Sequence, residues 1–205
     1  MIKNIVLDVG MVLVDWDWEG LFRYLGYDEE EVLWDLAHYT VLSKRWLEWD
    51  RSIKSDEQLL DEMLMVAPIY ENEITNIIDH IGEAVQPYRY TKPWIRELKD
   101  AGYKVYILSN YSRDLYNKTI EEELDFLPLT DGALFSWQCH YIKPEPEIYE
   151  TLFKQFDLEP KECVFLDDRQ ENLDAAEKFG MKTILFEDYE EASEKLSQLL
   201  QSEGL

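Results

Sequence analysis

The sequence has little cysteine, no long apolar run and few basic residues, and each shortage narrows the class of protein. Its two cysteines, Cys139 and Cys163, lie in or beside apolar, strand-like stretches without metal-ligand spacing. We expect both thiols to be reduced and buried. No run of 18 apolar residues occurs, which argues against a membrane-spanning helix. The N-terminus lacks the pattern of a secretory signal peptide, so a cytoplasmic protein is expected.

Acidic residues outnumber basic ones, with 44 Asp and Glu against 20 Lys and Arg and a formal net charge of −24. Because binding to nucleic acids depends on clustered basic side chains, we exclude DNA and RNA as main partners. The chain is nevertheless rich in core-forming residues, since 46% of its 205 residues are hydrophobic and 14% are aromatic. This composition predicts a folded protein with one full domain and a smaller one.

Three short apolar runs each end at polar side chains. They are rich in Ile, Val, Leu and aromatic residues, which is typical of strands covered on both faces. The runs span residues 4–9, 104–108 and 163–166, and their polar ends are Asp8, Ser109, Asp167 and Asp168. In an open parallel α/β sheet, ligands bind outside the carboxyl ends of the strands. We therefore expect these side chains to share one pocket.

The arrangement of signals along the chain predicts an α/β fold. From residue 87 onward strand and helix signals alternate, which indicates a doubly wound parallel sheet with right-handed crossovers. Gly102 and Gly180 stand where helix C-caps are expected, just before two of the strands.

An acidic, Trp-rich block with helical periodicity follows the first strand. Asp28 and Ser55 are the predicted N-caps of two of its helices. The first strand must belong to the sheet, because alone it could not be buried, so the helical block is an insertion. We predict a core of residues 1–15 and 88–205 and an inserted domain of residues 16–87.

Four motifs, in this order and on these elements, resemble those of the haloacid dehalogenase superfamily of hydrolases. The likeness is strongest to its sugar-phosphatase-like branch, which includes bacterial α-glucose-1-phosphate phosphatase and the phosphatase domain of soluble epoxide hydrolase. The motifs are DVGMVLVDWD from residue 8, LSNYSR from 108, KPEPEIY from 143 and FLDDRQENLDAA from 165. The resemblance implies a Rossmann-like parallel-sheet core, an α-helical cap domain and a reaction through a phospho-aspartate.

The same resemblance implies roles for residues of the first three motifs. Asp8 matches the nucleophile, whose carboxylate attacks phosphorus and divides the hydrolysis into two easier steps. Ser109 and Asn110 match the motif that holds phosphoryl oxygens. Lys143 matches the cation that neutralises the nucleophile and the phosphate, and so both catalyses the reaction and binds the substrate.

The fourth motif implies a metal site. Three carboxylates at adjacent strand ends would repel one another without a cation, and Mg²⁺ prefers oxygen ligands. The predicted ligands are Asp8, Asp168, the backbone carbonyl of Gly10 and, in a supporting place, Asp167. Asp168 stands in the metal-ligand column of the family pattern.

One position departs from the family pattern. Gly10 stands where the commonest pattern has a second Asp, which acts as general acid for the leaving alcohol. Without that acid, turnover should depend on the acidity of the leaving group or on another donor. Asp15 is the nearest candidate substitute in the sequence.

Residues 45–52 align with a family stretch near the mouth between cap and core. Trp46, Trp49 and Arg51 are candidates to contact a sugar-like leaving group, with Arg51 as a substrate-binding residue. For each Trp, packing between helix and core is the other interpretation.

The sequence predicts a Mg²⁺-dependent phosphomonoester hydrolase that acts on a small phosphorylated metabolite, with a sugar phosphate preferred to a nucleotide. A 2-haloacid dehalogenase is the alternative enzyme, since it also uses an Asp nucleophile without the second Asp. It needs no metal, so the Asp167–Asp168 pair argues against it. A non-catalytic binding protein on a phosphatase scaffold is the third possibility. The partner is a small phosphate ester, with no nucleic acid and no membrane, and the protein is expected to be a monomer or homodimer.

Overall fold

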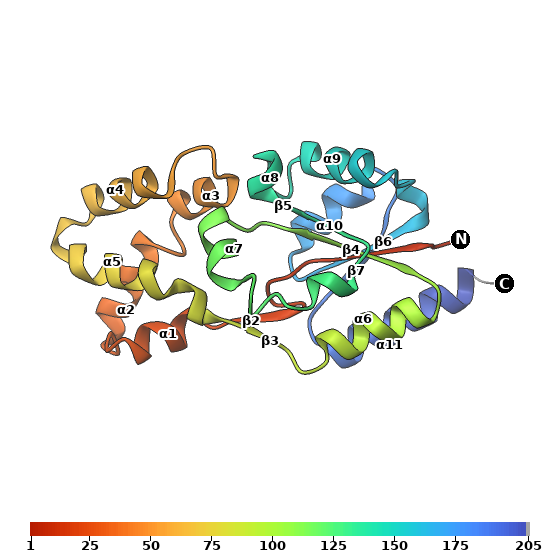
Figure 1. Ribbon diagram of the computed structural model, residues 1–205, viewed down its shortest axis with the longest axis horizontal. Coiled ribbons are helices and arrows are strands. Elements are labelled where there is room, and N and C mark those ends of the chain that lie inside the picture. The colour runs from red at the N-terminus through yellow and green to blue at the C-terminus, as the bar shows by residue number, and fades with distance from the viewer. Residues whose placement is uncertain (204–205) are drawn as a thin grey trace.

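A computed structural model describes residues 1–203 of the chain and shows a parallel five-stranded sheet between two layers of helices (Figure 1). The strand order is β5-β4-β1-β6-β7, and each neighbouring pair is parallel. Its strands are β1 (Asn4–Leu7), β4 (Lys104–Ser109), β5 (Gly132–Phe135), β6 (Cys163–Asp167) and β7 (Lys182–Leu185). The predicted α/β fold with a Rossmann-like core is confirmed.

Helices cover both faces of this sheet, which explains why its central strands are apolar throughout. One face carries α6 (Thr91–Asp100) and α11 (Tyr189–Glu203), and the other carries α9 (Pro146–Phe156) and α10 (Gln170–Glu177) (Figure 1). Alternate residues of one strand enter opposite cores. In β1, Ile5 and Leu7 pack toward α6 and α11, whereas Val6 packs toward α9 and α10.

A group of helices lies beside the core, at the left of Figure 1. The chain enters it after β2 (Val14–Trp16) and leaves it through β3 (Val85–Pro87), and these two strands pair antiparallel. The helices are α1 (Trp18–Tyr24), α2 (Glu30–Tyr39), α3 (Lys44–Arg51), α4 (Asp56–Val66) and α5 (Glu71–His80). The sequence did not predict the small β2–β3 sheet, whose strands have three residues each. The exact division into core and cap domains stays a prediction.

Local signals in the sequence predicted several element ends. Ser55 and Gln58 form the expected capping box at the start of α4. Gly102 and Gly180 have φ values of +93° and +92°, which suit residues without a Cβ. The prediction for Asp28 is wrong, because α2 begins at Glu30 with the preceding residue at the N-cap.

Shorter helices complete the fold of the described residues. They are α7 (Arg113–Thr119), α8 (Ser136–Cys139) and the 3₁₀ turns η1 (Pro68–Tyr70), η2 (Ile81–Ala84), η3 (Leu127–Leu129) and η4 (Pro160–Glu162). Both cysteines are free thiols, with Cys163 buried and Cys139 only partly so. Within residues 1–203, no helix combines the length and the apolar character needed to span a membrane.

The central strands should dominate the stability of the core. Ile107 in β4 is fully buried, so Ile107→Ala should lower the free energy of unfolding by about 2–5 kcal/mol, through lost burial and the cavity left behind. Ile69 is 80% exposed, and Ile69→Ala should change it by less than about 0.5 kcal/mol. Urea unfolding of both variants checks the contrast, and equal losses would contradict it.

Candidate active site

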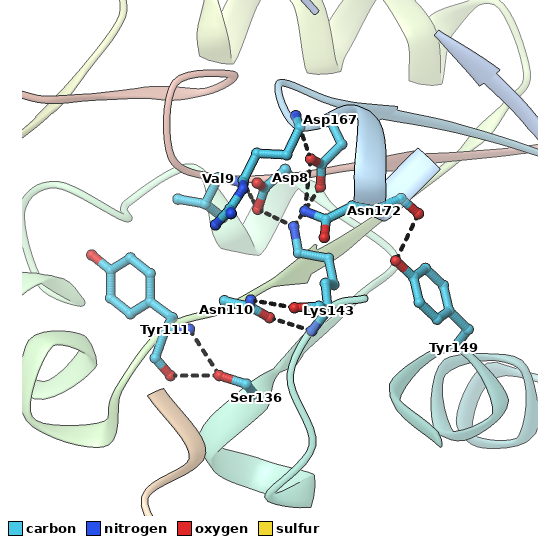
Figure 2. A network of polar contacts seen from close by, with 10 residues as sticks. Asp8, Val9, Asn110, Tyr111, Ser136, Lys143, Tyr149, Asp167 and Asn172 are labelled. Atoms are coloured by element: carbon cyan, nitrogen blue, oxygen red, sulfur yellow. Dashed lines mark hydrogen bonds and ion pairs between the residues drawn. The ribbon is translucent and has the colours of Figure 1, made fainter. Parts of the chain in front are cut away.

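Polar groups from three neighbouring strands meet at the carboxyl edge of the sheet. Asp8 follows β1, Ser109 ends β4 and Asp167 ends β6, and β1 lies between the other two strands. Lys143 comes from the loop before α9 and reaches the same place (Figure 2). The structure thus places Asp8, Ser109 and Lys143 in the wall of one cavity, whereas the fully buried Asp167 contacts Lys143 without lining that wall.

Lys143 forms two ion pairs at the centre of this group. Its Nζ lies 2.8 Å from Oδ1 of Asp8 and 2.6 Å from Oδ2 of Asp167 (Figure 2). Only 3% of Lys143 and 7% of Asp8 are exposed, and Asp167 is fully buried. Ion pairs this deeply buried are weakly screened by salt and strongly constrain the side chains that form them.

The ion pairs oppose the effect of burial on proton affinity. Burial alone would lower the pKa of Lys143, but the charges of Asp167 and Asp8 outweigh it and raise that pKa. Burial raises the pKa of Asp8, and the Lys143 charge opposes this rise. Burial and then the neighbouring Asp167 raise the pKa of Asp168. Lys143 therefore stays charged at neutral pH.

Asp167 is committed to protein contacts through both oxygens. Besides the ion pair at Oδ2, its Oδ1 accepts hydrogen bonds from the Arg169 backbone N–H at 2.8 Å and from Nδ2 of Asn172 at 2.9 Å. Asp168 forms no ion pair within residues 1–203. Asp167 thus orients Lys143, while Asp168 has the freer carboxylate.

The carboxylates provide a donor set that fits a divalent cation. One oxygen from each of Asp8, Asp167 and Asp168 lies within 4.8 Å of the others. Three carboxylates facing one ammonium group leave an excess of two negative charges when all are ionised. A Mg²⁺ ion would balance this excess, and carboxylate oxygens are the ligands it prefers. Gly10 lines the same cavity.

Asn110 holds the backbone of Lys143 through its side chain. Its Oδ1 accepts from the Lys143 N–H at 2.7 Å, and its Nδ2 donates to the Lys143 carbonyl at 3.0 Å (Figure 2). The amide is therefore engaged with protein, so Asn110 acts by positioning Lys143. Ser109 is buried, and its hydroxyl has no side-chain partner among residues 1–203, which leaves it available to a ligand.

A cavity of about 290 Å³ opens beside these groups. Residues from β2 and α3 complete its wall, with Trp16 and Trp46 at a ring-centroid distance of 5.6 Å. A hollow of about 480 Å³ lies along α6 and α11, but none of the strand-end carboxylates lines it. We place the functional site in the smaller cavity because it contains the chemically capable residues.

Arg51 is not where the sequence interpretation put it. Its guanidinium forms a two-pronged ion pair with Glu145, at 2.7 and 2.6 Å, and Arg51 does not line the cavity. The predicted substrate contact is therefore replaced by a link between α3 and the loop before α9. The residue just before it, Asp50, faces the cavity instead.

Of the three remaining candidates, only one lines the cavity. Trp46 lines the cavity, whereas Trp49 is buried and donates from Nε1 to Asp56 at 2.8 Å. Asp15 lies outside the cavity wall, and its Oδ1 accepts from the Trp16 N–H at 3.0 Å and the Tyr88 hydroxyl at 3.4 Å.

The sequence interpretation missed several residues of the cavity wall, among them Trp16, Asp50, Arg169 and Asn172. For Arg169 and Asn172 a signal existed, since both belong to the fourth motif. For Asp50 the signal was only its place within residues 45–52, the segment expected near the mouth between cap and core, and it was passed over in a block crowded with acidic residues.

The fold and the site together define an enzyme of the parallel α/β class, with nucleophilic and charged groups at the carboxyl ends of its strands. A family model, haloacid dehalogenase-like hydrolase, matches residues 2–180. The chain belongs to this family of hydrolases, and the predicted enzyme class is confirmed.

Relatives of nearly full length are known. The chain is 27% identical over 180 residues to a sesquiterpene phosphatase, astK, from Aspergillus oryzae, covering 87% of each chain. It is 26% identical over 223 residues to a D-ribitol-5-phosphate phosphatase from Bacteroides thetaiotaomicron, covering 98% of this chain and all of the relative.

Solved structures share the fold. One is a haloacid dehalogenase family enzyme from Bacteroides thetaiotaomicron in complex with magnesium and inorganic phosphate. It has a TM-score of 0.71 at 20% identity and covers 92% of this chain and 98% of its own. Another, an L-2-haloacid dehalogenase from Xanthobacter autotrophicus with chloropropionic acid covalently bound, has a TM-score of 0.65 at 16% identity, with 89% and 76% covered.

Removing the positive charge of Lys143 should destabilise the fold, because the buried carboxylates beside it would be left unpaired. Lys143→Met should lower the free energy of unfolding by about 3–5 kcal/mol at neutral pH without metal, because Asp8 and Asp167 lose their counter-charge. Adding Asp167→Asn should recover part of the loss, since one unpaired charge disappears. Urea unfolding in EDTA measures both effects, with the exposed Lys154→Met as control. Additive losses in the double variant would contradict this electrostatic account.

Proposed function

We propose that this protein is a Mg²⁺-dependent phosphatase that hydrolyses monoesters of small phosphorylated metabolites through a phospho-aspartate on Asp8. The observation that carries the proposal is the pairing of Asp8 with buried Lys143 at the wall of a cavity that also presents Asp168. Two relatives of nearly full length, both named as phosphatases, support it.

In this reaction Asp8 supplies the attacking oxygen. Its Oδ2 is not used in the ion pair with Lys143, which is made through Oδ1. As the Asp8 oxygen bonds to phosphorus, the bond from phosphorus to the ester oxygen breaks and the alcohol leaves. Water then cleaves the acyl phosphate, which releases phosphate and restores the carboxylate.

The other residues stabilise charge and orient the phosphoryl group. Lys143 holds Asp8 in place and offers positive charge to the phosphoryl oxygens, while the Ser109 hydroxyl can donate to one of them. Asn110 holds the backbone of Lys143, and Asp167 holds its ammonium group. Bound Mg²⁺, held by Asp8, Asp168 and the Gly10 carbonyl with Asp167 nearby, would neutralise the phosphate charge.

The cavity suits a small ester. Its volume of about 290 Å³ lies at the lower end of the range for ligand pockets. Trp16 and Trp46 provide an apolar wall on which the carbon skeleton of a sugar-like alcohol can pack. A sugar phosphate is therefore preferred to a nucleotide.

A 2-haloacid dehalogenase is the second candidate. It is favoured by the Gly at position 10 and by the shared fold with a dehalogenase that carries a covalently bound acid. The excess of carboxylates around Asp8 weighs against it, because a metal-free reaction would leave Asp168 without a counter-charge.

Loss of the nucleophile should abolish turnover without unfolding the protein. Asp8→Asn is nearly isosteric, but the amide cannot attack phosphorus, so hydrolysis of p-nitrophenyl phosphate should fall by at least about 10⁴-fold. Circular dichroism and thermal unfolding check that the fold remains. A phosphoryl group trapped on any residue other than Asp8 would contradict the assignment.

Removal of metal should suppress the same activity. Excess EDTA should stop turnover, and added Mg²⁺ should restore it, if Asp168 holds the ion. Asp168→Ala should weaken Mg²⁺ binding, measured by calorimetry, by at least about 10-fold, since it removes a direct ligand. Asp15→Ala, a carboxylate outside the cavity wall, should leave it unchanged. Full phosphatase turnover in EDTA would refute the metal role, and halide release from a 2-haloacid would favour the second candidate.

A further inference from the structure

Asp50, in the last turn of α3, presents a carboxylate to the active-site cavity from the helical side. The residue is only 6% exposed, and its side chain forms no hydrogen bond or ion pair within residues 1–203. A buried carboxylate without a partner is costly, so its place in the cavity wall calls for an explanation.

The backbone around Asp50 is fastened to the core at three consecutive residues. The buried Ser136 Oγ donates to the Asp50 carbonyl at 2.6 Å, and the His140 Nδ1 lies 2.8 Å from the Arg51 carbonyl. The Arg113 N–H donates to the Ser52 Oγ at 3.1 Å.

The Arg51 guanidinium adds its two contacts to Glu145. These links hold the end of α3 against the core, in the orientation that aims Asp50 at the cavity. The backbone that carries Asp50 is therefore tied directly to the core, although Asp50 belongs to a helix outside it.

The charged groups that face Asp50 are Lys143, Asp8 and Arg169. Burial raises the pKa of Asp50 to about 8; Lys143 opposes the rise, Asp8 adds to it and Arg169 opposes it. In the metal-free protein the carboxyl is therefore mostly protonated at neutral pH and has a proton to give. A neutral carboxyl also removes the cost of an unpaired buried charge.

We propose that Asp50 is the general acid that protonates the leaving alcohol during phosphate ester hydrolysis. This inference rests on the phosphatase function proposed above. As the Asp8 oxygen bonds to phosphorus and the ester bond breaks, the Asp50 proton passes to the departing oxygen, which leaves as a neutral alcohol. The Asp50 carboxylate then accepts a proton from the water that attacks the acyl phosphate, which restores the starting state.

This assignment accounts for Gly10, where the family pattern more often has an acid. A Cβ added at Gly10 would meet no atom within 4 Å, and the φ of Gly10 lies outside the left-handed region. The backbone at this position therefore tolerates a residue with a Cβ, yet in this proposal the chain supplies the carboxyl from α3. Asp15, the candidate from the sequence, is held outside the cavity wall by Trp16 and Tyr88.

The test compares two esters that differ in their need for an acid. The p-nitrophenolate of p-nitrophenyl phosphate leaves readily, whereas the alkoxide of glycerol 1-phosphate needs protonation. Asp50→Asn should lower kcat/KM for glycerol 1-phosphate by about 10²-fold or more and change that for p-nitrophenyl phosphate by less than about 5-fold. The parent should lose activity on glycerol 1-phosphate as the pH rises and Asp50 ionises, and Asp50→Asn should lack this decline.

Further variants test whether the loss of activity in Asp50→Asn comes from the missing acid or from a disturbed fold. Asp50→Glu retains an acid and should recover part of the alkyl activity. Gly10→Asp in the Asp50→Asn background should also recover it, by supplying a carboxyl from the first loop. Asp15→Asn and the exposed Asp61→Asn should show no selective loss on the alkyl ester.

The outcomes distinguish the two proposals. If the parent hydrolyses both esters and Asp50→Asn slows both equally, or neither, then Asp50 is not the acid and the phosphatase function stands. A selective alkyl loss in Asp15→Asn alone would transfer the role to Asp15. If the parent hydrolyses neither ester with Mg²⁺ present, the phosphatase function and the role of Asp50 fail together.

Discussion

The buried ion pairs between Lys143 and the carboxylates of Asp8 and Asp167 are the constraint on which the site depends. Three charged groups at the edge of an apolar sheet are stable only if their geometry is closely maintained, because each would be costly alone. The surrounding hydrogen bonds maintain this geometry. Asn110 fixes the backbone that carries Lys143, and Asn172 fixes the far oxygen of Asp167. The result is that Asp8, the proposed nucleophile, is held in place before any substrate arrives.

The second constraint is the attachment of α3 to the core. A site made only of strand ends would be open to water on the side of the helices. The contacts of residues 50–52 with Ser136, Arg113, His140 and Glu145 bring a carboxylate to that side, and Trp46 from the same helix adds an apolar wall. The proposed division of labour follows from this geometry: the sheet edge provides the nucleophile and its cation, and the helix provides the proton.

The strong negative charge of the chain makes local counter-charge necessary for binding a phosphate ester. Lys143 is already shared by two carboxylates, so it cannot by itself offset both the acidic cluster and an incoming anion. A bound divalent cation would resolve this conflict and make the acidic cluster compatible with the proposed anionic substrate. The family's solved magnesium and phosphate complex has the same fold.

The sequence by itself determined the α/β fold, the family, the strand ends that carry Asp8, Ser109 and Asp167, and helix ends such as the capping box at Ser55. These features depend on apolar runs and on neighbours a few residues apart, which a linear pattern records. Tertiary structure alone decided that Asp50 rather than Arg51 faces the cavity, that the Asn110 amide holds Lys143, and that Asp15 lies outside. Glu145 draws Arg51 away across 94 residues of chain, and Lys143 engages Asn110 across 33. Such partners meet only when the segments pack, because a side chain's direction is set by the contacts available to it in the folded state.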